Sequence, residues 1–284
     1  MSTESYPASE TYDAAVIGGG AAGLAAAMVL ARARRSVIVI DDGKQSNLVS
    51  SASHGVFAHD GTKPAALYQK AREELRRYPT MTFEDDRVTA ITRSRKDMFQ
   101  VTTVNKLAIT AKTILFAQGV NYNLPNVDGI EDLWGSDAWH CPYCDGYESA
   151  DKKLLVIGSE EWLEHMQLSL RSWSNDATFL HPNKVTKLTK VDDKITAILE
   201  NGRSITFDKV VVETTPSPRD TLADSLGCER ESNGNLVIKQ NSRTSADGVY
   251  AAGDQASEVA QVNVAVASGH MAGVNIDMYL SEKP

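Results

Sequence analysis

The chain has 284 residues, of which 42% are hydrophobic and 23% charged, as in ordinary globular proteins. This length exceeds that of one typical compact domain and predicts two. The formal net charge of -8 argues against a nucleic-acid surface, because neutralising phosphates requires clustered Lys and Arg. The three cysteines are too few for a disulfide scaffold, so a close pair is expected to be reactive or metal-binding.

The amino-terminal segment, residues 1–11, is polar and acidic and is expected to form a flexible tail. A signal peptide would begin with a basic stretch followed by an apolar one. No stretch approaches the roughly 18 to 20 apolar residues of a membrane helix. We therefore expect a cytoplasmic protein with neither a membrane nor a nucleic acid as partner.

Residues 12–43 predict an apolar strand, a glycine turn, an alanine-rich helix and a second apolar strand. The turn carries Gly18, Gly20 and Gly23 in G-x-G-x-x-G spacing, and Asp41 ends the second strand. Such glycines permit a tight turn, close approach of a pyrophosphate and close helix–strand packing. The helix amino terminus supplies amide donors, and the acid accepts ribose hydroxyls. This context predicts a dinucleotide site, for either FAD or NAD.

The rest of the chain predicts further strands and a second nucleotide-type fold. An apolar strand at residues 113–117 leads to Gly119, and the Pro- and Gly-containing connection after it predicts a crossing into a second domain. A weaker βαβ unit begins near Lys152 and ends in a strand at residues 177–180. Paired strands then lead to another apolar strand at residues 210–213. The carboxyl-terminal segment predicts a short strand, a Gly-Asp turn and a long helix of small residues.

Two of the three cysteines lie in the segment HCPYCDGY, residues 140–147. A structural zinc site needs about four ligands, usually from a second C-x-x-C or a pair of His, and the sequence offers neither. Two residues between Cys141 and Cys144 suit a helical turn that brings the sulfurs together and can lower the pKa of one thiol. Pro142 suits the first turn of such a helix. A redox pair is therefore favoured over a metal site, and no metal is expected.

Three ordered motifs, the glycine-rich turn, CPYCDG and Y-A-A-G-D near the carboxyl end, together resemble the low-molecular-weight thioredoxin reductases. The resemblance covers about residues 12–281, and SHGVFAHDG and CPYCDGYE are similar to the branch that includes gliotoxin and holomycin dithiol oxidases. It implies a homodimer of α/β class, with two Rossmann-like (three-layer β/β/α) domains, the second inserted into the first. An FAD domain would comprise residues 12–119 and 242–284. An NADPH-type domain carrying the redox pair would comprise residues 120–241.

The resemblance also implies FAD as the cofactor. Asp254 would bond its ribityl chain, and Gln261 and Val262 begin a helix whose first amides would face the flavin, where a helix amino terminus stabilises negative charge. Gln118 stands where the family usually has Thr. The residues expected to bind FAD are Gly18, Gly20, Ala21, Ala22, Gly23, Asp41, Asp42, Asn47, Gly119, Gly253, Asp254, Gln261 and Val262.

The resemblance assigns roles at the redox pair as well. Cys144 would face the flavin as the charge-transfer thiol, and Cys141 would exchange with the substrate. Asp145 matches the acid that shuttles protons in thioredoxin reductases, where many members of the oxidase-like branch carry His. An exposed acid without catalytic role is the alternative for Asp145. The loop that contains His54 is interpreted as a capped polar loop, with control of substrate access as the alternative.

The second nucleotide site departs from the pattern that the resemblance implies. The expected G-x-G-x-x-A or G-x-G-x-x-G is replaced at residues 158–163 by GSEEWL, which places Glu160 and Glu161 where a pyrophosphate would lie. One like-charge contact costs about 1 kcal/mol in water and about 4 kcal/mol at an effective dielectric of 20. The expected arginine cluster is replaced by HPNK, which ends at Lys184. NADPH binding is therefore doubtful; a divergent but working site that uses Lys184 or Lys187 is the alternative.

The sequence thus predicts an FAD-dependent thiol-disulfide oxidoreductase that passes electrons between FAD and a substrate disulfide or dithiol, with weak or no use of NADPH. A dithiol oxidase with dioxygen as acceptor is one alternative, and a non-catalytic flavin-binding redox module is another. The expected partner is a thioredoxin-like protein or a small dithiol or disulfide. Ferredoxin or another carrier is the expected substitute donor.

Overall fold

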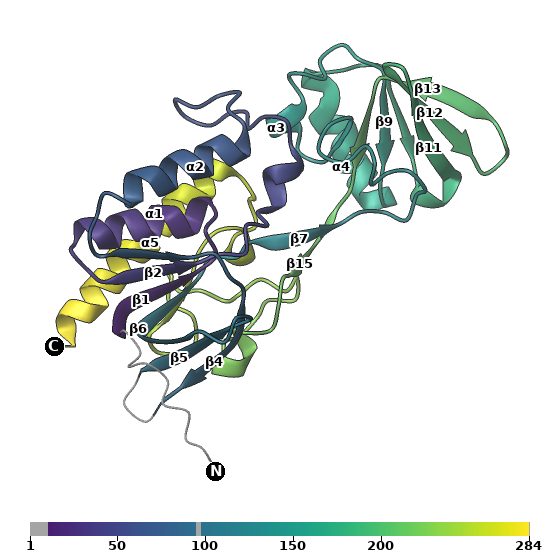
Figure 1. The fold of residues 1–284 in the computed structure, drawn as a ribbon. Coiled ribbons are helices and arrows are strands. Elements are labelled where there is room, and N and C mark those ends of the chain that lie inside the picture. Colours follow the sequence, from purple (N-terminus) through teal and green to yellow (C-terminus); the bar gives the residue numbers. More distant parts are fainter. Residues whose placement is uncertain (1–10, 95–97, 284) are drawn as a thin grey trace. The chain divides into compact units, whose positions relative to one another are not determined.

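The computed structural model describes residues 11–94 and 98–283. Within these residues the chain divides into two compact units, and the second is inserted into the first (Figure 1). The segments of the first unit are 11–46, 65–121 and 217–283, and those of the second are 47–64 and 122–216.

The first unit is built on a sheet that is parallel at its centre and antiparallel at one edge. Strands β1, β2, β3, β6 and β16 are parallel, whereas β4 pairs antiparallel with β5 and β5 with β6. The strand order is β3-β2-β1-β6-β5-β4, with β16 also paired to β6. The bounds are β1 Thr11–Ile17, β2 Val37–Ile40, β3 Met81–Glu84, β4 Val88–Arg93, β5 Phe99–Thr103, β6 Ala108–Phe116 and β16 Val249–Ala251.

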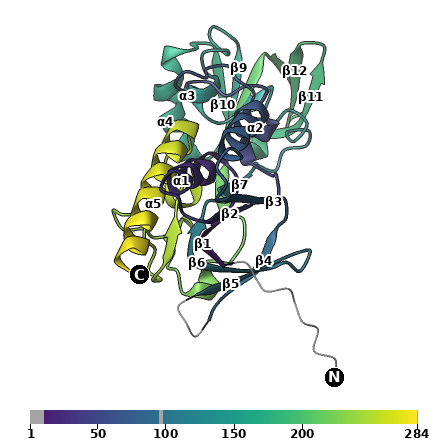
Figure 2. The same cartoon turned by 60° about the vertical axis from the view of Figure 1, so that its left-hand side comes forward.

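Helices α1 (Ala21–Arg32) and α5 (Val262–Glu282) lie side by side over one face of this sheet (Figures 1 and 2). Their small residues permit unusually close packing, because a Cβ atom at Gly269 would lie 2.0 Å from the Ala22 carbonyl oxygen. Helix α2 (Pro64–Leu75) contributes its buried last residue to the same core. The alanine-rich composition of α1 thus serves close helix packing.

The opposite face of the sheet packs against residues 217–241. Leu222, Cys228 and Leu236 share a buried cluster with Phe99 on β5. The sequence placed residues 217–241 in the inserted domain, whereas in the structure they cluster with the first unit. Burial of their apolar side chains against the first sheet accounts for this difference.

The second unit contains a parallel sheet and an antiparallel sheet. The parallel sheet has the order β10-β9-β14-β8, and the antiparallel one has the order β11-β12-β13. The strand bounds are β8 Ala138–Trp139, β9 Leu154–Ile157, β10 Ala177–Leu180, β11 Val185–Val191, β12 Lys194–Leu199, β13 Ser204–Phe207 and β14 Lys209–Val212.

The alternation of buried side chains along β9 holds the layers of the second unit together. Leu155 and Ile157 pack against the antiparallel sheet. Leu154 and Val156 point to the other face and pack against α4 (Glu160–Ser169). Sheet, sheet and helix thus form three layers, which confirms the predicted Rossmann-like β/β/α architecture.

Short elements connect the layers. Strands β7 (Val120–Asn123) and β15 (Thr215–Pro218) pair where the chain passes between the units. Helix α3 (Pro142–Asp145) carries the cysteine motif. The short 3-10 helices are η1 Ser46–Val49, η2 Leu170–Ser172, η3 Pro182–Lys184, η4 Asp224–Leu226 and η5 Asp254–Ala256. Among the described residues, none of the helices has both the length and the apolar character needed to span a bilayer.

Candidate redox and cofactor sites

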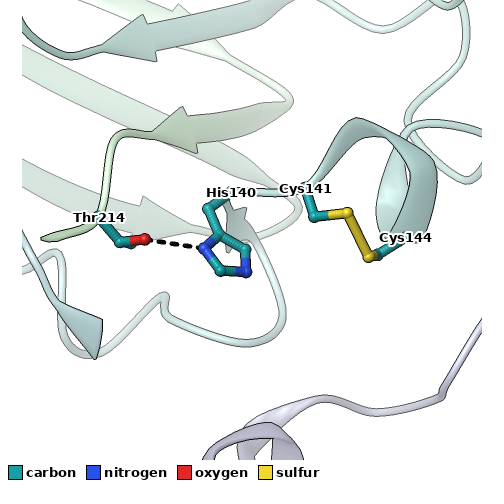
Figure 3. The surroundings of a disulfide bond; sticks show 4 residues. All are labelled: His140, Cys141, Cys144 and Thr214. Atoms are coloured by element: carbon teal, nitrogen blue, oxygen red, sulfur yellow. Dashed lines mark hydrogen bonds between the residues drawn. A yellow bond between two sulfur atoms is a disulfide. The ribbon is translucent and has the colours of Figure 1, made fainter. Parts of the chain in front are cut away.

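Cys141 and Cys144 form a disulfide at the start of helix α3, with their Cα atoms 5.2 Å apart (Figure 3). Cys141 precedes the helix, and Pro142 occupies its first position, where the missing N–H costs little. The amides of Cys144 and Asp145 both donate to the Cys141 carbonyl oxygen, at 3.0 and 3.1 Å. The tight turn predicted from the spacing is therefore present and brings the two sulfurs together.

The disulfide lies at a surface where a substrate can reach it. Both cysteines are only half-buried. The side chains of Tyr143 and Tyr147, on the same short segment, are 75% and 82% exposed. The ring of Trp173 makes an edge contact with the ring of Tyr143, at 5.6 Å between centroids. The disulfide segment thus packs against Trp173 while two of its tyrosine side chains remain exposed.

His140, directly before the disulfide, is half-buried against two aromatic rings. Its Nδ1 atom is hydrogen-bonded to the Thr214 hydroxyl at 2.8 Å (Figure 3). The rings of Tyr122 and Trp134 meet the imidazole edge to face, at 4.7 and 5.4 Å. Burial lowers the pKa of His140 to about 4. The ring is therefore neutral near pH 7 and helps to anchor the backbone before Cys141.

Asp145, the predicted proton carrier, directly follows Cys144 and is half-buried. Burial, reinforced by the nearby carboxylate of Glu148, raises the pKa of Asp145 to about 6. The charges of His54 and Lys209 act in the opposite direction. A carboxyl group that titrates close to neutral pH can both accept and return a proton during thiol–disulfide exchange.

The predicted FAD-binding glycines lie where β1 and β6 end. A Cβ atom at Gly18, whose φ is 106°, would lie 2.5 Å from the Ala117 carbonyl oxygen, and one at Gly23 would lie 1.9 Å from the Gly18 carbonyl oxygen. Beside Gly20, in contrast, the nearest described atom to an added Cβ lies 3.6 Å away, and beside Gly119 no atom of the described residues lies within 4 Å. Gly18 and Gly23 are therefore closely packed, whereas Gly20 and Gly119 leave open space, as a pyrophosphate-binding turn requires.

The strand order explains this position. The chain leaves β1 through α1 to β2 on one side, whereas β6 lies on the other side of β1. Such a switch point opens a crevice at the carboxyl ends of the two strands. No side chain of the described residues caps the amino terminus of α1, and its first turn, which includes Ala21 and Ala22, carries no acid. These amides can therefore receive an anionic phosphate.

Asp41, at the end of β2, is nearly buried and already has two partners. The Gln45 amide donates to both of its carboxylate oxygens, at 3.1 and 2.9 Å, and Arg72 forms an ion pair at 3.2 Å. A carboxylate has about four acceptor positions, so ribose hydroxyls can still bind to it. The neighbouring Asp42 is exposed, and Asn47 belongs to the second unit.

The carboxyl-terminal motif reaches the first turn of α1. Gly253 follows β16 with a φ of 77°, and a Cβ atom there would lie 3.0 Å from the Ala22 Cβ. Asp254 begins η5 directly after this turn. Gln261 precedes α5 and Val262 begins it, as expected from the sequence. The structure thus brings Gly253 to the glycine-rich turn, and Asp254 follows it directly.

Two polar side chains that the sequence analysis did not single out also fit a bound cofactor. Among the described residues, the buried Arg219 Nε and Gln255 Nε2 atoms have no hydrogen-bond partner. The Arg219 Nη2 atom donates to the Ser46 hydroxyl at 2.8 Å. Buried donors of this kind are normally satisfied, so a ligand with acceptor atoms would suit them. Gln255 directly follows the Gly-Asp motif, which is the sequence signal that could have identified it.

In the second unit, the amino terminus of α4 is occupied by the protein's own side chains. The Ser159 amide and hydroxyl both donate to the Glu213 carboxylate, at 2.6 and 3.1 Å. The Ser159 oxygen in turn accepts from the Trp162 amide. A Cβ atom at Gly158 would lie 2.4 Å from the Trp162 ring, so this ring lies directly on the glycine. The Glu213 carboxylate therefore already accepts the hydrogen bond that the Ser159 amide offers at this helix terminus.

The cations that could serve a divergent nucleotide site also have partners. Lys184 pairs with Glu200 at 2.6 Å, and Lys187 pairs with Asp128 at 3.1 Å. Both lysines belong to exposed pairs, which are individually weak. Neither offers the bidentate geometry with which arginine holds a phosphate.

A glycine-rich dinucleotide cradle, a Rossmann-like inserted unit and an accessible disulfide define a dinucleotide-dependent disulfide oxidoreductase. The chain belongs to the pyridine nucleotide-disulphide oxidoreductase family, whose model matches residues 12–159 and 168–269. It is therefore an oxidoreductase, and FAD is the cofactor that the family implies. The residues at the glycine-rich turn fit that cofactor.

Known proteins are similar to most of this chain. It is 29% identical to "Thioredoxin reductase tcpT" of Claviceps purpurea, with 93% of both proteins covered. It is 34% identical to the "Probable thioredoxin reductase" of Arthroderma benhamiae over 58% of this chain but only 42% of that protein. The crystal structure of HlmI is 31% identical and superposes with a TM-score of 0.90, covering 96% of this chain and 93% of that one.

Proposed function

We propose that the protein exchanges electrons between a substrate dithiol or disulfide and FAD through Cys141 and Cys144, without a nicotinamide nucleotide in its second unit. The observation that carries this proposal is the Glu213 carboxylate bound at the amino terminus of α4. A phosphate approaching this helix would meet a carboxylate already hydrogen-bonded there, beside Glu160 and Glu161. Each like-charge contact of this kind weakens binding by about tenfold or more.

For FAD, we propose the site that the sequence predicted, with Arg219 and Gln255 added. Gly18, Gly20 and Gly23 shape the cradle, and the first amides of α1 hold the pyrophosphate. FAD, when bound, accepts or supplies two electrons. The remaining residues of the proposed site are Ala21, Ala22, Asp41, Asp42, Asn47, Gly119, Gly253, Asp254, Gln261 and Val262.

At the disulfide, the steps follow from thiolate chemistry. A substrate thiolate attacks the Cys141 sulfur, the Cys141–Cys144 bond breaks, and Cys144 leaves as a thiolate. A second substrate thiolate then attacks the substrate sulfur of this mixed disulfide, which releases oxidised substrate and reduced Cys141. Two electrons remain on the cysteine pair, Cys141 becomes a thiol, and Asp145 accepts the other proton. The reverse sequence reduces a substrate disulfide.

The proposed substrate is a thioredoxin-like protein or a small dithiol or disulfide. A dithiol oxidase with dioxygen as acceptor is a second candidate, favoured by the same occupied helix terminus, because the dithiol itself would then supply the electrons. Ferredoxin or a similar carrier is the donor proposed for the reducing direction. The half-buried disulfide, on a segment with exposed side chains, speaks against a non-catalytic flavin-binding module.

We also propose that the protein acts in the cytoplasm as a homodimer. Apolar side chains exposed along α5 support the dimer: Val266, Met271 and Met278 are 44%, 51% and 56% exposed. Light scattering on the purified protein tests this point, and a monomer at micromolar concentration would contradict it.

The test of the proposed function is anaerobic mixing of the flavin-loaded protein with NADPH, NADH, reduced ferredoxin and dithiothreitol in turn. We expect dithiothreitol to bleach the flavin absorbance and micromolar NADPH to leave it unchanged. Hydrogen peroxide formed when air is admitted would favour the dithiol oxidase. Rapid bleaching by NADPH would overturn the proposal for the second unit.

A further inference from the structure

The loop from Ser53 to Thr62 lies against the helix that carries the disulfide. Its ends are joined by two backbone hydrogen bonds, from the Ser53 amide to Thr62 at 2.8 Å and from the Gly61 amide to Ser53 at 3.0 Å. A Cβ atom added at Gly55 would lie 3.9 Å from the carbonyl oxygen of Tyr143, which stands between the two cysteines. Loop and helix belong to the same compact unit.

One side chain of this loop faces carboxylates next to the redox pair. The Nδ1 atom of His54 lies 3.4 Å from Glu148 Oε1 and 3.7 Å from Asp60 Oδ1. Glu148 follows Asp145 by three residues and is the less exposed of the two partners, at 44% against 73% for Asp60. The pair with Glu148 is therefore less screened by solvent than the one with Asp60.

Three ionisable side chains act on the pKa of Asp145. Glu148 raises the pKa of Asp145, in addition to the larger effect of burial, whereas His54 and Lys209 lower it. Lys209 is held elsewhere, because its ammonium group pairs with Asp137 at 2.6 Å and donates to the Ser136 carbonyl oxygen. His54 is therefore the basic side chain on the loop whose partner, Glu148, itself acts on Asp145.

We propose that His54 and Glu148 are positioning residues whose charges set the pH at which Asp145 exchanges a proton with the cysteine pair. The inference rests on the proposed role of Asp145. When a dithiol reduces the disulfide, two protons leave the substrate thiols; one remains on Cys141 and the other passes to Asp145. The more negative the surroundings of Asp145, the higher the pH at which its carboxylate becomes available for this proton.

The two side chains must then act in opposite directions. The substitution His54→Gln removes the imidazole that can carry a positive charge beside Glu148, so Asp145 should lose its proton at higher pH. The substitution Glu148→Gln removes a negative charge and should have the reverse effect. The double substitution should return the profile close to that of the wild-type protein. A unit charge a few ångströms away typically moves a titration by about one pH unit.

The experiment follows the rate at which dithiothreitol reduces Cys141–Cys144 in the purified protein, by acid quenching, alkylation and mass spectrometry across the neutral pH range. We expect the rising limb of the pH–rate profile to move by about one unit to higher pH in His54→Gln and by a similar amount to lower pH in Glu148→Gln. His59→Gln, in the same loop, is the matched control and should match the wild type.

A profile that moves in the same direction in both variants, or in neither, would overturn the inference. The midpoint of thermal unfolding checks that each variant is folded. The double variant separates a charge effect from local structural damage, because opposite charge changes cancel whereas structural damage would remain. The readout does not depend on the flavin. If the disulfide is reduced while the flavin stays oxidised, the proposed function fails but the inference about Asp145 is still tested.

Discussion

Cys141 and Cys144 share a disulfide but have different proposed roles. Replacing Cys144 with Ser leaves no internal thiol to form the disulfide, so thiol-driven bleaching of the flavin should be abolished. Anaerobic absorbance spectroscopy with dithiothreitol measures this. The control is Cys228→Ala, because Cys228 is buried in the first unit against Thr244, whereas the cysteine pair belongs to the second unit. Unchanged bleaching in Cys144→Ser would refute the proposed electron path.

Asp145 should make the stability of the protein depend on pH. Its pKa rises from 3.8 to about 6 on folding, so the folded state binds the proton more tightly than the unfolded state. This stabilisation is present below about pH 3.8 and is lost as the pH rises through about 6. Asp145→Asn does not titrate, so it keeps this stabilisation at every pH. Between acidic pH and pH 7, its free energy of unfolding should therefore rise by up to about 3 kcal/mol relative to that of the wild type.

Urea unfolding of the wild type and of Asp145→Asn, compared at acidic and neutral pH, measures this difference. The matched control is Asp151→Asn, on the same segment beyond the helix. If the difference in free energy of unfolding between wild type and Asp145→Asn is the same at acidic and neutral pH, the pKa of Asp145 is not raised by folding.

Arg219 is expected to strengthen FAD binding, although the sequence analysis did not select it. Its buried Nε atom lacks a partner among the described residues. Loss of a hydrogen bond from a charged donor costs about 1.5 to 3 kcal/mol, so Arg219→Gln should weaken FAD binding by at least about tenfold. Fluorescence titration of the flavin-free protein with FAD measures the dissociation constant.

The matched control is Arg243→Gln. Its Nε atom is also buried without a partner within the described residues, but its guanidinium lies over the ring of Tyr279, on α5. An equal loss of FAD affinity in both variants would point to general destabilisation of the first unit rather than to a contact with the cofactor.

At the scale of elements, α1 and α4 show how similar βαβ units can differ in function. Both helices follow a parallel strand and a glycine, yet only α4 has a side-chain cap and acids in its first turn. In α4, the capping oxygen of Ser159 and the carboxylates compensate the helix dipole. In α1, the amino terminus remains available for an external anion.

The substitution Glu213→Gln should recover part of the nucleotide affinity of the second unit. It removes the negative charge of Glu213 that lies next to the Ser159 amide. The weak binding of NADPH should therefore tighten by about tenfold. Isothermal titration at high nucleotide concentration measures this. Glu164→Gln, on the same helix but beyond its first turn, is the control. Equal affinities in the two variants would show that Glu213 does not block the nucleotide.

For the whole molecule, net charge should govern which thiols react. The chain carries a net charge of -8, and Asp60 and Glu148 lie exposed in the loop and segment beside the disulfide. Dimercaptosuccinate, a dithiol with two carboxylates, should therefore reduce Cys141–Cys144 more slowly than dithiothreitol, which has none. Added salt should narrow this difference, because it screens surface charges beyond about 10 Å at 0.1 M.

Alkylation and mass spectrometry at low and high salt measure both rates. Dithiothreitol serves as the internal control, because its attacking thiolate carries fewer negative charges and its rate should depend less on salt. If the anionic dithiol is the faster reductant at low salt, the acidic surface does not select against anionic substrates.

Local patterns predicted the elements closely. The strand expected at residues 177–180 is β10, the apolar run before Gly119 forms the end of β6, and the final helix begins at Val262. The C-x-x-C spacing predicted the paired sulfurs. Each of these features depends on contacts between near neighbours in the chain, so periodicity, glycine and proline sufficed to find them.

The sequence by itself thus determined the α/β class, the glycine-rich cradle, the cysteine pair and the acids at the start of α4. Only the tertiary structure brought Glu213 to Ser159, His54 to Glu148 and residues 217–241 to the first sheet. These contacts join residues distant along the chain, and burial and charge pairing across the fold decide them. No local pattern records which side chains such packing will place together.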